Sequence, residues 1–254
     1  MMQSLTSADG TKIAFDRLGA GPPLIVVLGA FNSRASHMEF AQALAEHFTV
    51  YHYDRRGRGE SGDTLPWSVE REVEDIAALA EHAGGEPLLF GYSSGAVLAL
   101  KAAAALRIGR LALYDTPLTE QPDQELPKRL AELIERGDRG GAVELFQLSI
   151  GIPEEVVAQL RNAPFRPGLE AMAHTLVYET SITADPEVLT KDAPAITVPT
   201  LLMAGAGSGP IMTDAAARLS NAIPDATVQV LDGQTHDIVP DVIVPRLREF
   251  FGAV

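Results

Sequence analysis

One stretch of sequence decides the fold of this chain: Phe90-Gly91-Tyr92-Ser93-Ser94-Gly95-Ala96. Residues 87–90 before it are typical of a short buried strand, and the alanine-rich residues 94–106 favour a tightly packed helix. A strand that turns directly into a helix at Ser93 must bend sharply, and glycines two residues to either side leave room for that bend. The pattern therefore predicts a serine hydroxyl that projects from the turn, beside helix N–H groups that favour negative charge.

Strands and helices alternate on both sides of this stretch. Before it we expect a hairpin around Asp9-Gly10, a strand over 23–28, a helix over 36–47, a strand over 48–53 and a helix over 69–83. After it we expect strands over 111–114, 200–204 and 226–231, with helices over 213–222 and 239–251. This alternation predicts an α/β fold with a mostly parallel central sheet flanked by helices.

The alternation is interrupted from residue 116 to about residue 198. Helical patterns follow one another there without strands, and prolines are frequent. We therefore expect residues 1–115 and 199–254 to form the core and residues 116–198 to form a helical insertion. The sheet would then frame the insertion on both sides.

Composition narrows the possible functions. The chain has 254 residues, of which 46% are hydrophobic, and this is enough for a substantial core. A formal charge of −14 argues against a nucleic-acid partner, and the sequence holds no cysteine for disulfides or thiolate chemistry. Neither a leader pattern nor a membrane-length apolar run is present, so we expect a cytoplasmic protein without a membrane partner. Its oligomeric state is left open.

A serine hydroxyl is a poor nucleophile at neutral pH, so Ser93 needs a base, and the base needs an orienting acid. His236 follows the last predicted strand, where a loop can approach a nucleophile at the carboxyl ends of parallel strands. We therefore expect His236 to be the general base. The other five histidines occupy positions typical of surface or packing residues.

Taken together, these motifs resemble the α/β-hydrolase superfamily. Gly91-Tyr92-Ser93-Ser94-Gly95 is similar to its nucleophile elbow, residues 54–61 to its D-x-R-G-x-G-x-S loop, and Gly233-Gln234-Thr235-His236 to its histidine loop. The resemblance covers all of the chain except the insertion. It implies the α/β-hydrolase fold with an inserted helical cap and serine-dependent acyl chemistry, for which we expect neither a cofactor nor a metal ion.

The acid departs from the usual family pattern. Family members commonly carry an aspartate just after the strand that ends here at Ala204, but residues 205–210 contain no carboxylate. Asp214 is the nearest carboxylate, in the first turn of the next helix, where an acidic residue mainly favours the helix dipole. Asp115 ends the strand after the nucleophile helix, as the acid does in certain dehalogenases and lactonases. We therefore expect the triad Ser93, Asp115 and His236, with Asp214 as the alternative acid.

The resemblance also assigns an oxyanion hole and a substrate pocket. Ala30 and Ser94 match the backbone donors by position, with Gly29 or Phe31 as alternatives if the alignment shifts by one residue. The arginines of residues 55–58 are expected to hold loops together through ion pairs. The cap would supply apolar and aromatic surface, and the residues that we expect to bind substrate are Phe31, Tyr92, Phe146, Met172 and Tyr178.

These features favour a serine hydrolase that cleaves a carboxylic ester, lactone or thioester of an apolar small molecule. The Ser-Ser-Gly-Ala sequence after Tyr92 and the early acid also resemble fungal zearalenone-type lactonases. Non-hydrolytic proteins use the same fold, so a lyase or cyclase of a natural-product pathway, or a ligand sensor, is the alternative.

Overall fold

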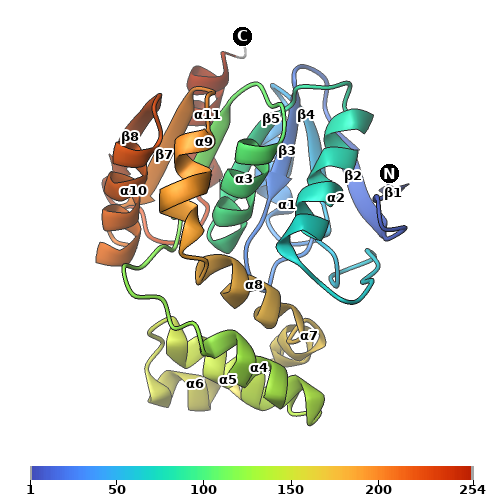
Figure 1. Cartoon of the computed structure of the whole chain (residues 1–254), viewed down its shortest axis with the longest axis vertical. Helices are drawn as coiled ribbons and strands as arrows, with labels where there is room; N and C mark the ends of the chain where they lie inside the picture. The colour runs from blue at the N-terminus through green and yellow to red at the C-terminus, as the bar shows by residue number, and fades with distance from the viewer. Residues whose placement is uncertain (1, 253–254) are drawn as a thin grey trace.

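Across residues 2–252, which the computed structural model describes, eight strands form one sheet in the order β1-β2-β4-β3-β5-β6-β7-β8 (Figure 1). Strand β2 pairs antiparallel with both β1 and β4, and every other neighbouring pair is parallel. The strands are β1 Met2–Thr6, β2 Lys12–Leu18, β3 Pro23–Val27, β4 Thr49–Tyr53, β5 Leu88–Tyr92, β6 Leu111–Tyr114, β7 Thr200–Gly205 and β8 Ala226–Leu231. The expected α/β-hydrolase fold class is confirmed.

Helices cover both faces of the sheet, as continuous apolar strands require. Along β3, Leu24 and Val26 point into one hydrophobic cluster and Ile25 and Val27 into the other. The first cluster is covered by α1 Met38–Leu44 and α11 Pro240–Phe251, and the second by α2 Val69–His82, α3 Ser94–Ala105 and α10 Pro210–Ala222. The central strands are therefore buried on both sides, whereas the edge strands β1 and β8 are mostly exposed. The loops at the carboxyl ends of the central strands remain available to form a site.

The segment between β6 and β7 is helical and extends beyond one end of the sheet (Figure 1). Its helices are α4 Leu126–Glu135, α5 Arg139–Ser149, α6 Glu154–Leu160, α7 Arg166–Ala171 and α8 Thr175–Thr183. They have a hydrophobic cluster of their own, which includes Leu130, Val143 and Leu176. We call α4 to α8 the cap.

Part of the segment expected in the insertion packs with the core instead. A π-helical turn, η1 Val188–Asp192, and the short helix α9 Ala193–Ala195 follow the cap. Their residues Val188 and Ala193, together with Ile196, belong to the same hydrophobic cluster as α3. The alanine-rich face of α3 allows this close approach. Residues 188–196 thus pack with the helices of the core, although they precede residue 199.

Two helix boundaries also differ from the expected ones. Helix α1 is shorter than the expected 36–47, and α10 begins at Pro210 instead of residue 213. Proline is well suited to the first helical position because its missing N–H would have no intrahelical partner there. Within the described residues, no helix is long and apolar enough to cross a membrane.

Candidate active site

Ser93 lies at the sharp junction between β5 and α3. Its backbone has φ 56° and ψ −134°, a conformation that side-chain-bearing residues rarely adopt. A Cβ added at Gly91 would lie 2.6 Å from Ala96 Cα, and one added at Gly95 would lie 2.5 Å from the Leu28 carbonyl carbon. Both glycines are therefore needed for the close packing around the bend that presents Ser93.

His236 joins Ser93 to Asp115 through its two ring nitrogens. Nε2 lies 3.0 Å from Ser93 Oγ, and Nδ1 lies 3.0 Å from Asp115 Oδ2. A proton on Nδ1 satisfies the carboxylate and leaves Nε2 free to accept the serine proton. The three residues that the sequence predicts as nucleophile, base and acid are thus in hydrogen-bond contact.

The loop that carries His236 is anchored by two tyrosines on neighbouring strands. The Tyr92 hydroxyl donates to the His236 carbonyl oxygen at 2.6 Å, and the Tyr114 hydroxyl donates to the Thr235 carbonyl oxygen at 2.5 Å. Burial and the nearby carboxylates of Asp237 and Asp115 raise the pKa of both phenols, so both remain donors. The tyrosines therefore hold the histidine loop against the ends of β5 and β6.

Asp115 is fully buried at the end of β6, with φ 50°. Its Oδ1 accepts a 2.9 Å hydrogen bond from the Gly205 N–H, and its Oδ2 accepts a 2.6 Å bond from the Ser208 hydroxyl. Asp214, the alternative acid, is exposed on α10. The carboxylate that contacts His236 Nδ1 is therefore the one on β6.

The expected oxyanion donors lie next to Ser93. The Ala30 N–H donates a 3.0 Å hydrogen bond to Ser94 Oγ, so the loop after β3 contacts the first residue of α3. Ser94 itself starts the helix, where a backbone N–H has no intrahelical acceptor. Phe31 follows with φ 59°, which turns the chain sharply after Ala30.

A cavity of about 780 Å³ opens above these residues, between the core and the cap. Phe31 and Phe146 meet edge to face across its wall, with ring centroids 5.4 Å apart. The lining includes the expected triad residues Ser93 and His236, the expected oxyanion residues Ala30 and Ser94, and the expected binding residues Phe31, Tyr92 and Phe146. The lining as a whole is largely apolar, although the cap also contributes polar residues such as Arg129 and Thr183.

Two of the expected substrate-binding residues are not in this lining. Tyr178 stacks on Trp67 at 4.6 Å between ring centroids, and its hydroxyl donates to Asp63 at 2.8 Å. Met172 lies at the end of α7 and is also outside the lining. Tyr178 therefore faces the junction between the cap and the core. The sequence alone does not show which side of a cap helix meets the cavity.

Three contact residues were not predicted from the sequence: Gly205, Ser208 and Tyr114. Ser208 lies in the loop after β7, which contains no carboxylate, and this absence is the sequence signal that points to a different polar group there. Tyr114 directly precedes Asp115 and could only be read as a strand residue. Their contacts join segments far apart in the sequence.

The fold and the Ser93–His236–Asp115 arrangement are typical of α/β-hydrolases, and a comparison with known protein families gives the same class. The sequence profile of the alpha/beta hydrolase family matches residues 24–243, so the chain belongs to this family. Two relatives aligned over more than nine-tenths of the chain carry hydrolase names, and a third, aligned over 42% of it, is an ethanol acetyltransferase.

Particular relatives extend over nearly the whole chain. The N-formylmaleamate deformylase of Pseudomonas putida is 28% identical, with 97% of this chain and 92% of the deformylase aligned. The crystal structure of an alpha/beta hydrolase from Sphaerobacter thermophilus is 45% identical, with a TM-score of 0.89 over 98% of this chain and 100% of that chain. The enol-lactonase from Burkholderia xenovorans is 22% identical, with a TM-score of 0.74 over 98% of this chain and 100% of that chain, and it shares the fold.

Proposed function

We propose that this protein is a serine hydrolase that cleaves a carboxylic ester, lactone or thioester of an apolar small molecule. The observation that carries the proposal is the pair of 3.0 Å contacts that link Ser93, His236 and Asp115 at the floor of a largely apolar cavity. Activation of a serine needs this order of nucleophile, base and orienting acid.

In the proposed reaction, His236 Nε2 accepts the Ser93 proton as the serine oxygen attacks the substrate carbonyl. Asp115 keeps the imidazole in the required tautomer and stabilises its charged form. The negative oxygen of the tetrahedral intermediate replaces the Ser94 hydroxyl as acceptor of the Ala30 N–H and is also bound by the Ser94 N–H. His236 then protonates the leaving group, and water activated by the same histidine hydrolyses the acyl-enzyme.

The cavity supports an apolar acyl group or ring. Cap residues Phe146, Leu145 and Leu148 and the core residue Phe31 contribute apolar surface to the lining, close to the reacting serine. Among the similar proteins are an enol-lactonase and an esterase from Thermogutta terrifontis. Because these two similar proteins are named for lactone and ester hydrolysis, esters and lactones are the first substrates to test.

The test is covalent labelling combined with a substrate panel. The protein is incubated with a fluorophosphonate, and the adduct is located by mass spectrometry, with Ser93→Ala as the control. We expect one adduct, on Ser93, and turnover of at least one ester, lactone or thioester that Ser93→Ala does not support. An unlabelled Ser93 would refute the acyl-enzyme, and labelling without turnover across the panel would favour a ligand sensor or a non-hydrolytic enzyme.

A further inference from the structure

A buried group of two arginines and two glutamates lies directly behind the loop that carries Ala30. We call Arg55, Arg58, Glu72 and Glu179 the arginine–glutamate cluster. The side chains are at most 2% exposed, and they come from three elements: the loop after β4, helix α2 and cap helix α8. The cluster therefore connects the cap with the core through charged groups that water does not reach.

Ion pairs hold the cluster together. Arg55 forms a two-point contact with Glu72, with N–O distances of 2.7 and 2.8 Å, and its Nη1 lies 2.9 Å from Glu179. Arg58 Nη2 donates to the same Glu179 carboxylate. Burial of Glu72 favours its protonated form, but the charges of Arg55 and Arg58 and the hydrogen bonds from Arg55 and Trp67 together outweigh this effect and lower the pKa of the carboxyl. Burying four charges is costly, so stability alone is a weak reason for their presence.

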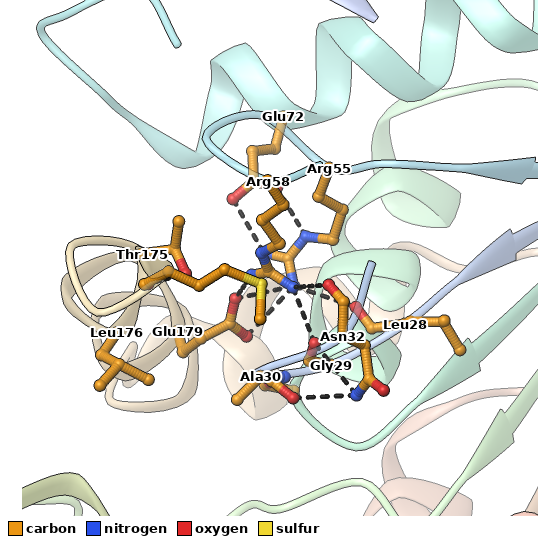
Figure 2. Close-up of polar contacts among 12 residues, drawn as sticks. Leu28, Gly29, Ala30, Asn32, Arg55, Arg58, Glu72, Thr175, Leu176 and Glu179 are labelled. Carbon is orange, nitrogen blue, oxygen red and sulfur yellow. Dashed lines mark hydrogen bonds and ion pairs between the residues drawn. The ribbon is translucent and has the colours of Figure 1, made fainter. Parts of the chain in front are cut away.

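The same guanidinium groups also hold the backbone of the loop after β3 (Figure 2). Arg55 Nη1 donates to the Leu28 carbonyl oxygen at 3.1 Å, and Arg58 Nη1 donates to the Gly29 carbonyl oxygen at 2.7 Å. In the described part of the chain, Arg58 Nε is buried without a hydrogen-bond partner. The position of the Arg58 guanidinium therefore allows the hydrogen bond to the Gly29 carbonyl oxygen but leaves its Nε–H without an acceptor.

The Gly29 carbonyl and the Ala30 N–H belong to one peptide plane. In a trans peptide the two groups point in opposite directions, so a donor that fixes the carbonyl also fixes the direction of the N–H. The Ala30 N–H points to Ser94 Oγ, beside the nucleophile. A charged donor on the carbonyl also polarises the peptide and strengthens its N–H as a donor.

We propose that Glu179, acting through Arg58, orients the Gly29–Ala30 peptide and makes the oxyanion donor available only when cap helix α8 is in place. Glu179 and Arg58 are positioning residues in this proposal, which rests on the proposed serine hydrolase function. The cap then contributes to the rate of the chemical step as well as to the shape of the cavity.

The first experiment compares Glu179→Gln with Glu144→Gln. Glu144 is also on the cap and pairs with Arg161 and Arg166, but it is absent from the cavity lining. With p-nitrophenyl butyrate, we expect Glu179→Gln to lower kcat roughly 10- to 100-fold while KM changes less than about twofold. Phosphonylation of Ser93 by a fluorophosphonate should slow by a similar factor, because the phosphoryl oxygen of the reagent accepts hydrogen bonds from the same N–H donors as the oxyanion. Glu144→Gln should match the wild type in both measurements.

A double variant keeps the proposal testable if the single change disturbs folding. Arg58→Met with Glu179→Gln removes one charge of each sign and leaves Arg55 paired with Glu72. The single variants Arg58→Met and Glu179→Gln are measured beside it. If both residues act through the same peptide, kcat of the double variant falls by about as much as in the more impaired of the two single variants. Losses that multiply, or wild-type kcat and phosphonylation in Glu179→Gln, would overturn the proposal.

The outcomes also separate this proposal from the proposed function. If the wild-type protein neither reacts with a fluorophosphonate at Ser93 nor hydrolyses p-nitrophenyl butyrate, the serine hydrolase function fails, and the positioning role fails with it. If the wild type is labelled on Ser93 and Glu179→Gln is labelled at the same rate, only the positioning role is refuted.

Discussion

The hydroxyl of Ser208 donates a 2.6 Å hydrogen bond to Oδ2 of Asp115, the same oxygen that lies 3.0 Å from His236 Nδ1. Ser208 follows β7, in the loop where related hydrolases commonly carry the acid. A serine there cannot orient a histidine by charge, but it can hold a carboxylate that reaches the site from the neighbouring strand β6. In the proposed triad, β6 thus supplies the carboxylate and the loop after β7 supplies a hydrogen bond to it.

Replacing Asp115 with asparagine tests the acid directly. Asp115→Asn should lower kcat by about 10⁴-fold, because an amide no longer stabilises the required tautomer and charge of His236. Asp214→Asn, on the exposed face of α10, should leave kcat unchanged. The measurement is steady-state hydrolysis of an ester that the wild type turns over, with circular dichroism to check folding. The reverse ranking of the two variants would assign the acid to Asp214.

Ser208→Ala removes one hydrogen bond to the buried Asp115 carboxylate. A hydrogen bond to a charged group contributes about 1.5–3 kcal/mol, and part of this will appear as poorer orientation of His236. We expect kcat to fall roughly 10-fold with little change in KM. Ser220→Ala, on the outer part of α10, is the control and should have wild-type kinetics. Equal kinetics for both variants would show that the Ser208 hydroxyl does not support the acid.

Gly95→Ala should destabilise the fold. The added methyl group would lie 2.5 Å from the Leu28 carbonyl carbon and oxygen, and neither backbone atom can move without displacing β3. We expect a loss of about 3 kcal/mol in the free energy of unfolding, measured by urea denaturation. Gly168→Ala on α7 meets no atom within 4 Å and should be neutral or slightly stabilising. Equal stability of the two variants would contradict the tight contact at the elbow.

Phe146→Ala should alter substrate selection. Phe146 meets Phe31 edge to face in the cavity lining, and its removal enlarges the apolar wall. We expect KM for a short apolar acyl ester to rise roughly 5- to 20-fold, since apolar contact is lost, and longer acyl chains to be favoured over short ones. Phe165→Ala, at an exposed position, is the control. An unchanged chain-length profile would place the acyl group elsewhere.

Stability should fall as the pH is lowered through the titration of Glu72. Its folded-state pKa is below its ordinary value of 4.5, so its contribution to stability is present above that value and is lost as the pH falls further. Glu72→Gln should reduce stability at pH 7 and flatten the decline in unfolding free energy between about pH 5 and pH 3. Glu74→Gln, which removes a surface pair with Arg71, should keep the wild-type slope. A wild-type slope in Glu72→Gln would contradict this account.

Local patterns in the sequence predicted the parts of the site that lie in one short segment. The elbow at Ser93, the strand that ends at Asp115 and the loop of His236 each carry their signal within a few residues, and the alternation of strands and helices brings their ends together. The contacts of Ser208, Tyr114 and Glu179 could not be predicted in this way. They depend on which side of a loop or helix faces the site, and this is set by tertiary packing.

The position of Asp115 after β6 places the proposed nucleophile, the proposed acid and the proposed Ser94 donor within one continuous β5–α3–β6 unit, residues 88–115. The cap follows this unit in the sequence, and the proposed base, His236, follows the cap. Exchange of residues 126–171 for a different set of cap helices, with α8 and its Glu179 retained, would therefore leave Ser93, Asp115 and His236 on their original supports, and the loop of Ala30 and Phe31 would lose its cap contacts. In this architecture, new substrate preferences can evolve, or be engineered, by recombination of the cap without rebuilding the reaction centre.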